Sequence, residues 1–258
     1  MSVSSRLLSE IFSLKKREMV SLIGSGGKTT LLYLLAGELA RRGWKAILTT
    51  TTHLKKPDGE DLPLILEEDE ETLLGRVRET LQEFPSVLAA RSCSPEGKLD
   101  GLGGDVIDKL LNLAETDVVL VEADGARMKS LKAYAPHEPV IPSATTQILV
   151  VIGIDCVGQP LSEECVHRPA LAAEALGVRE GELITPESVV HLITSPGGYL
   201  ERAKPGRVTV ILNKVDGFPE LQWALEVSRG IAPDPRVSQV VLRGDYLSGG
   251  LWDLGKGA

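Results

Sequence analysis

The stretch that most constrains this chain is Met19–Leu32, MVSLIGSGGKTTLL, where an apolar run enters a glycine-rich turn and then an apolar helical pattern. This order predicts a strand, a tight turn and a helix in direct succession. The amides of the turn and the positive end of the helix dipole then face one point, which suits an anion. Lys28 adds a positive charge for terminal phosphates, and the hydroxyl of Thr29 can bind Mg²⁺. The sequence therefore predicts a cradle for the phosphates of GTP or ATP.

The turn is shorter than the standard G-x-x-x-x-G-K-[ST] phosphate loop, because Leu22 stands where the first glycine is usual. Its form, G-x-x-G-K-T-T, is similar to the phosphate loop of the Mur ligases. The alternative is a flexible turn before an ordinary helix, but the preceding strand and the following helix favour phosphate binding. The residues predicted to bind the nucleotide are Gly24, Ser25, Gly26, Gly27, Lys28, Thr29 and Thr30.

Strand and helix patterns alternate along the rest of the chain. Strands are predicted at Met19–Ile23, Trp44–Thr50, Leu62–Leu66, Ser86–Ala90, Asp117–Val121, Thr146–Ile152, Val208–Leu212 and Ser238–Leu242. Helices are predicted at Ser4–Leu14, Lys28–Arg42, Glu67–Glu83, Asp105–Ala114, Glu163–Leu176, Pro186–Ile193 and Pro219–Arg229. This alternation predicts a three-layer α/β fold, with a mostly parallel sheet and a P-loop NTPase-like core. The 258 residues are expected to form one such domain, 1–258.

Two acidic residues, Glu122 and Asp124, follow the buried strand DVVLV. A carboxylate at such a strand end holds Mg²⁺ in phosphate-loop enzymes, because this hard cation prefers oxygen ligands. Glu122 directly follows the apolar run and therefore ranks above Asp124. The alternative is an acidic turn without a metal. Thr29 and Glu122 are the predicted metal ligands, and Lys28, Glu122 and Asp124 are predicted to be catalytic.

A third motif, Asn213-Lys214-Val215-Asp216, follows the strand VTVIL and resembles the N-K-x-D element of GTPases. A carboxylate at Asp216 can accept two N–H donors from guanine, whereas adenine would leave its charge unpaired. Asn213, Lys214 and Asp216 are therefore predicted to bind the base and to favour GTP over ATP, the alternative being a chance polar loop. The long distance from Lys28 to Asn213 predicts an inserted substrate region at about 125–200.

Further polar residues are candidates for substrate contact. His53 ends the run Thr49-Thr50-Thr51-Thr52-His53 and could carry a proton, although threonines are also common in ordinary strands. In the inserted region Arg127 or Arg168 could reach a transferring phosphate, and such basic loops suit a small anionic substrate.

Zinc binding by three side chains of this region is a weaker alternative. Their spacing matches no zinc motif, and each histidine is more often structural. The three residues are His137, Cys165 and His167.

The composition excludes some classes of partner. The net charge of −8 and the absence of long basic runs argue against nucleic-acid or membrane-surface binding. No apolar run is long enough for a membrane helix, and the N-terminus has no apolar segment typical of a signal peptide. Three scattered cysteines form no disulfide framework. We therefore expect a cytoplasmic protein, while the oligomeric state stays open.

Taken together, the motifs resemble the YqeC family. They run from about Ser13 to Tyr246 and are G-x-G-G-K-T-T, T-T-T-H, E-A-D-G, H-E-P-x-I-P, G-x-D-x-x-G-x-P-L, H-R-P and N-K-x-D. The family is known as accessory proteins of selenium-dependent molybdenum hydroxylases. The resemblance implies a nucleotide-binding protein that assists maturation of such an enzyme, with the hydroxylase or its cofactor as a partner.

The resemblance does not supply a reaction, and three hypotheses remain open. The first is a Mg²⁺-dependent GTPase or ATPase. The second is an ATP-dependent Mur-like ligase or kinase that acts on a small anionic substrate. The third is a non-catalytic chaperone gated by nucleotide.

Overall fold

The computed structural model of this chain describes residues 7–57, 62–245 and 251–255. Residues 4–6 of the helix expected at Ser4–Leu14 lie outside the described residues. The described part of that segment forms the short helix α1 (Leu8–Ile11).

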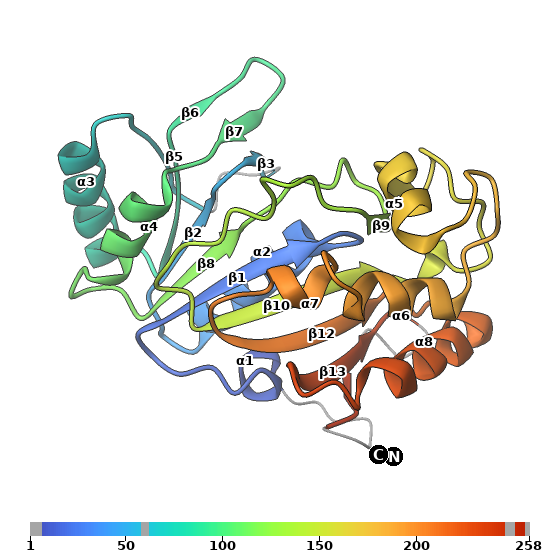
Figure 1. Cartoon of the computed structure of the whole chain (residues 1–258). Helices are drawn as coiled ribbons and strands as arrows, with labels where there is room; N and C mark the ends of the chain where they lie inside the picture. Colours follow the sequence, from blue (N-terminus) through green and yellow to red (C-terminus); the bar gives the residue numbers. More distant parts are fainter. Residues whose placement is uncertain (1–6, 58–61, 246–250, 256–258) are drawn as a thin grey trace.

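A nine-stranded sheet forms the centre of the molecule, in the order β14-β13-β12-β10-β1-β8-β2-β5-β4 (Figure 1). Its strands are β1 (Glu18–Gly24), β2 (Ala46–Thr50), β4 (Leu64–Leu66), β5 (Ser86–Ala90), β8 (Val118–Glu122), β10 (Gln147–Gly153), β12 (Arg207–Asn213), β13 (Val237–Arg243) and β14 (Leu251–Asp253). Neighbours pair in parallel, except for the antiparallel edge strand β14. Every residue of β1, β8 and β10 is buried, which explains why these strands read as continuous apolar runs.

Helices cover both faces of this sheet. Val20 and Leu22 of β1 belong to one core, which α1 and α2 (Lys28–Arg41) complete with residues such as Leu35. Met19 and Ile23 belong to the core on the opposite face. Helices α3 (Glu70–Glu83), α4 (Gly104–Leu111), α5 (Pro169–Leu176), α6 (Pro186–Thr194) and α8 (Phe218–Ile231) contribute to this second core. The expected α/β fold with a mostly parallel sheet is therefore confirmed.

Some elements differ from the sequence prediction. Helix α5 begins at Pro169 rather than at Glu163, because Arg168 adopts a φ of 65° and proline occupies the first helical turn. The residues before it form β11 (Val166–His167), which pairs in parallel with β9 (Leu131–Lys132). A small sheet of β3 (His53–Lys55), β7 (Lys98–Asp100) and β6 (Ser92–Cys93), the short helices η1 (Ile154–Cys156) and α7 (Tyr199–Arg202), and edge strand β14 were not predicted.

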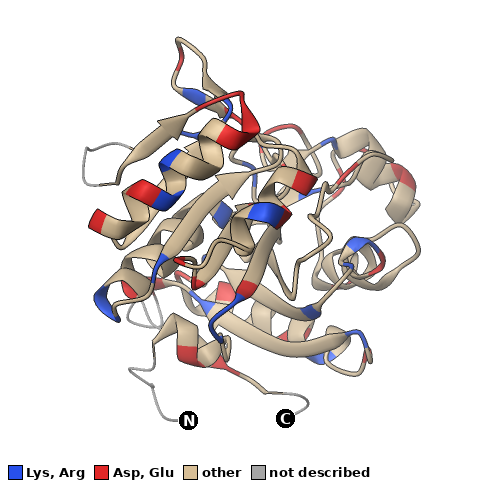
Figure 2. Ribbon diagram, turned by 90° about the vertical axis from the view of Figure 1, so that its left-hand side faces the viewer, with Lys and Arg blue, Asp and Glu red and all other residues tan. Residues whose placement is uncertain are grey.

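The region 125–200 does not stand apart from the sheet. It contributes β10, which pairs with β1 on one side and β12 on the other. The segments 123–146 and 154–206 flank β10 and lie outside the main sheet. Figure 2 shows acidic and basic residues interspersed over the visible elements. Within the described ranges, no helix combines the length and the apolar character that crossing a membrane requires.

Candidate functional site

The candidate site lies where the parallel strands end. Glu122 at the end of β8 pairs in register with Leu22 of β1 and with Thr50 at the end of β2. On the other side of β1, Gly153 of β10 pairs with Asn213 of β12. Because the carboxyl ends of parallel strands meet at one edge, the polar residues predicted from the sequence gather around the turn between β1 and α2.

Three glycines give this turn its shape. Gly24, Gly26 and Gly27 have φ values of +96°, +79° and +127°, which side-chain-bearing residues rarely adopt. A Cβ atom at Gly24 would lie 2.2 Å from the carbonyl oxygen of Val151, and one at Gly27 would lie 2.2 Å from Nδ2 of Asn213. The close approach of neighbouring strands therefore requires glycine here.

The amides of the turn fall into two groups. The N–H groups of Ser25 and Gly26 donate to the carbonyls of Val151 and Lys129, both at 2.8 Å. Within the described chain, by contrast, the N–H groups at the start of α2 have no protein acceptor. They belong to Gly27, Lys28, Thr29 and Thr30. Free amides at the positive end of a helix can bind an anion.

Lys28 lies at the start of the same helix and is 4% exposed. Its Nζ donates to the carbonyl of Gly24 at 2.6 Å and pairs with Oδ1 of Asp124 at 2.9 Å. Oε1 of Glu122 lies farther away, at 3.9 Å. Burial opposes the charged form, but Asp124 and Glu122 outweigh it and raise the pKa of Lys28. The lysine is therefore held as a cation, and Asp124 is its nearest carboxylate.

Glu122 instead contacts the threonine of the loop. Oγ1 of Thr29 donates to Oε2 of Glu122 at 2.7 Å. Burial raises the pKa of Glu122, although Lys28 and the Thr29 hydroxyl favour its charged form. A hydroxyl and a carboxylate beside this glycine turn are ligands of the kind that Mg²⁺ prefers, so the donor set fits this ion.

Asn213 joins the N-K-x-D element to the turn between β1 and α2. Its Nδ2 donates to the carbonyl of Gly26 at 2.6 Å, and its Oδ1 accepts from Arg243 at 2.9 Å. Nζ of Lys214 donates to Oγ of Ser130 at 2.7 Å and pairs with Asp155 at 2.9 Å. The structure thus places Asn213 beside Gly26 of the turn and Lys214 beside Ser130 and Asp155.

Asp216 lies at the exposed end of the same element. One of its carboxylate oxygens, Oδ1, accepts the backbone N–H of Asp245 at 2.9 Å. This bond orients the carboxylate by a backbone contact. Glycine at position 244 is required nearby, because a Cβ atom there would lie 2.3 Å from backbone atoms of Val215.

Lys132, one of the basic residues of the inserted region, is a buried part of this site that the sequence prediction did not include. Its Nζ lies 3.3 Å from Oδ2 of Asp124 and donates to the carbonyl of Gly125 at 2.7 Å. Oδ2 of Asp124 also accepts the N–H of Gly24 at 2.8 Å. A single charged residue between Leu131 and Ala133 is the signal that could have indicated an internal ion pair.

Two predicted catalytic residues have no bond to this cluster among the described residues. His53 lies on β3, where its Nδ1 is 3.0 Å from Oδ1 of Asp100 and its side chain is 71% exposed. Arg127 is exposed and has a φ of 48°.

The zinc alternative is not supported by the structure. Nowhere in the described ranges do three or more His, Cys, Asp and Glu side chains gather as a metal-binding group.

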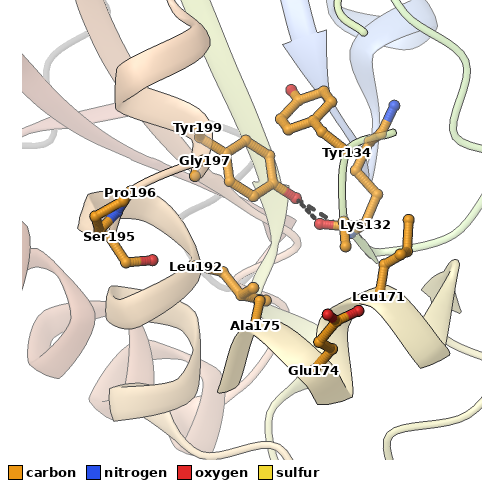
Figure 3. Close-up of a pocket in the computed structure, with 12 residues that line it drawn as sticks. Lys132, Tyr134, Leu171, Glu174, Ala175, Leu192, Ser195, Pro196, Gly197 and Tyr199 are labelled. Atoms are coloured by element: carbon orange, nitrogen blue, oxygen red, sulfur yellow. Dashed lines mark hydrogen bonds between the residues drawn. The ribbon is translucent and has the colours of Figure 1, made fainter. Parts of the chain in front are cut away.

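A cavity of about 260 Å³ is lined by residues that include Lys132, Tyr134 and Tyr199 (Figure 3). Tyr199 lines this cavity and also lies beside the turn between β1 and α2. A Cβ atom at Gly24 would lie 3.2 Å from its ring. The rings of Tyr134 and Tyr199 meet edge to face with centroids 5.0 Å apart. The wall is completed by Leu171, Glu174, Ala175, Leu192 and the segment 195–198.

Comparison with known proteins identifies a family model and a relative that each match more than half of the chain. The family model described as YqeC protein matches residues 20–170, which include the glycine turn, Glu122, Asp124 and Lys132. The uncharacterized protein YqeC of Escherichia coli strain K12 is 32% identical over 202 residues, which cover 78% of this chain and 77% of the relative. The chain belongs to the YqeC family.

Proposed function

We propose that this protein binds a nucleoside triphosphate with Mg²⁺ through a P-loop NTPase-like core. The observation that carries the proposal is the set of amides at the start of α2 that find no acceptor in the described chain, placed beside the buried cation of Lys28. Anion binding at a helix N-terminus needs donors and positive charge, and both are present. The three positive-φ glycines support it, because they leave the turn without side chains.

In this proposal each residue of the loop has a defined role. The amides of residues 27–30 bind the phosphate oxygens, and Lys28 neutralises the terminal phosphates. Thr29 and Glu122 hold the Mg²⁺ ion, which when bound offsets the negative charge of the triphosphate. The Thr29 hydroxyl and the Glu122 carboxylate already lie 2.7 Å apart, so only small displacements are needed to admit a shared ligand.

We favour GTP as the nucleotide. The bond from Asn213 to Gly26 supports this choice, because a base-binding element has to lie close to the phosphate loop. The carboxylate of Asp216 has one oxygen bound to the N–H of Asp245, which supports a fixed orientation for recognition of the base. ATP is the alternative, and equal affinities for the two nucleotides would exclude the guanine proposal.

We further propose, from the family resemblance, that nucleotide binding or hydrolysis in the cytoplasm assists maturation of a selenium- and molybdenum-dependent hydroxylase. The partner in this proposal is that enzyme or its labile cofactor. In this proposal the partner contacts residues 123–146 and 154–206, which lie outside the main sheet.

Binding and product analysis test the proposal together. Calorimetric titration with MgGTP and MgATP measures the affinities, and phosphate release is then followed without any second substrate. Release of free phosphate supports an NTPase. Turnover that needs a small anionic acceptor supports the ligase or kinase, whereas binding without turnover supports a nucleotide-gated chaperone. Absence of binding at millimolar nucleotide would refute the proposed function.

A further inference from the structure

Asp124 is shared by two buried lysines. Its side chain is 0% exposed, and its two oxygens lie 2.9 Å from Nζ of Lys28 and 3.3 Å from Nζ of Lys132. The side chain of Lys28 is 3% exposed and that of Lys132 is 0% exposed. A buried carboxylate is costly when it lacks a cation, so each lysine stabilises the charge of Asp124.

If the loop binds a nucleotide, Lys28 has to compensate both the carboxylate of Asp124 and the terminal phosphates. In the structure its Nζ is engaged by Asp124 and by the carbonyl of Gly24. To neutralise a terminal phosphate, the same ammonium has to give up at least part of its contact with Asp124. That step leaves Asp124 with the N–H of Gly24, at 2.8 Å, and with Lys132.

Lys132 is held firmly in its position. The Tyr199 hydroxyl donates to its carbonyl at 2.7 Å and accepts its N–H at 3.1 Å. Figure 3 shows the side chain running from this anchor past the ring of Tyr134, and Nζ lies 4.6 Å from the ring centroid. Nζ also donates to the carbonyl of Gly125 at 2.7 Å. The ammonium is therefore already placed beside Asp124 without rearrangement.

A second carboxylate, Glu138, also lies near Lys132, but its negative charge is compensated by another cation. Glu138 lies 3.5 Å from Nζ of Lys132, but it also forms an ion pair and a hydrogen bond with Arg168. Burial opposes the charged carboxylate, but the hydrogen bond from Arg168 and the nearby Lys132 outweigh it and lower the pKa of Glu138. Since Arg168 compensates the charge of Glu138, the positive charge of Lys132 can stabilise the carboxylate of Asp124.

We propose that Lys132 is a positioning residue that keeps Asp124 compensated while Lys28 turns to the phosphates of the nucleotide. This inference rests on the proposed nucleotide binding. Without Lys132, the buried carboxylate depends on Lys28 alone and holds it back from the phosphates. The affinity for nucleotide therefore depends on Lys132, although this side chain touches no phosphate in the proposal.

A double-mutant cycle tests this role through the dissociation constant for MgGTP and MgATP. Lys132→Met is expected to weaken binding by about tenfold or more, because it leaves Asp124 with one cation. In the Asp124→Asn background the same Lys132→Met change is expected to alter affinity by less than about threefold. A purely structural role for Lys132 would weaken binding in both backgrounds. Lys45→Met is the control, since Lys45 precedes β2 at the end of the strands away from the site and its Nζ donates to the carbonyl of Phe84 at 3.1 Å, so binding should stay at the wild-type level.

The outcomes separate this inference from the proposed function. Wild-type protein that binds no nucleotide overturns both. Wild-type protein that binds, together with unchanged affinity in Lys132→Met, overturns the role of Lys132 alone, as does equal loss of affinity in the two backgrounds. If Lys132→Met does not fold, Lys132→Arg supplies the single variant, because it keeps the charge and is expected to retain affinity within about threefold of wild type. A tenfold loss in a folded Lys132→Arg protein would then contradict a role based on charge.

Discussion

Replacing Gly27 with alanine is expected to destabilise the protein strongly. The backbone at Gly27 has φ 127° and ψ 17°, which costs about 1–3 kcal/mol for a residue with a side chain. The new Cβ atom would also lie 2.2 Å from Nδ2 of Asn213, which donates to the carbonyl of Gly26. Displacing that amide loses a hydrogen bond worth about 1 kcal/mol. The expected loss in free energy of unfolding is about 2–4 kcal/mol.

The matched control is Gly37→Ala, inside the helix α2 that Gly27 precedes. Gly37 is exposed, its φ is not positive, and no atom lies within 4 Å of a Cβ atom built there. Alanine in a helix interior is favoured over glycine by about 0.5–1 kcal/mol, so this variant should be slightly stabilised.

Urea denaturation followed by far-UV circular dichroism measures both free energies of unfolding. Calorimetry should show a transition lowered by roughly 5–15 °C for Gly27→Ala, given the size of the chain. A Gly27→Ala protein within about 0.5 kcal/mol of wild type would refute this account of the loop.

Three further outcomes are expected. Thr29→Val and Glu122→Gln should each raise the Mg²⁺ concentration needed for nucleotide binding, and an unchanged Mg²⁺ titration would count against both residues as metal ligands. Asp216→Ala should remove any preference for GTP over ATP in competition binding, and a preserved preference would place base recognition elsewhere. Burial, with Arg168 and Lys132, lowers the pKa of His167 from 6.5 to about 4. The unfolded chain then binds this proton first as the pH falls, so stability is lost between about pH 6.5 and 4. NMR should place the His167 midpoint near 4, and His167→Gln should remove this part of the acid sensitivity.

The elements nearest the site could be predicted from the sequence because their signals are local. The apolar run, the glycine turn and the helical pattern are continuous along the chain, and α2 begins at Lys28 as expected. Helix α3 likewise begins at a local signal, because the Asp69 side chain before it accepts the N–H of Thr72 at 2.9 Å.

The ion pairs could not be predicted in the same way. Ranking Glu122 above Asp124 used only the distance of each from the apolar run. In the folded chain, Asp124 turns back to the N–H of Gly24 and to Lys28, while Glu122 meets Thr29. Lys132 lies on β9, and its charge between Leu131 and Ala133 indicates an internal ion pair without identifying Asp124 as the partner.

The start of helix α5 could not be predicted from the apolar spacing. The apolar spacing over Glu163–Leu176 predicts one helix, but the left-handed backbone of Arg168 and the following proline delay its start. Arg168 then bonds with Glu138, so this local interruption depends on a tertiary contact.

The most direct test of the central proposal is a crystal structure with Mg²⁺ and a non-hydrolysable GTP analogue. We expect the phosphates on the amides of residues 27–30 and on Nζ of Lys28, with Mg²⁺ held by Thr29 and Glu122. We also expect Asp216 to contact the base and Lys132 to remain beside Asp124. A nucleotide bound elsewhere, for example in the cavity lined by Tyr134 and Tyr199, with this loop empty, would contradict the account.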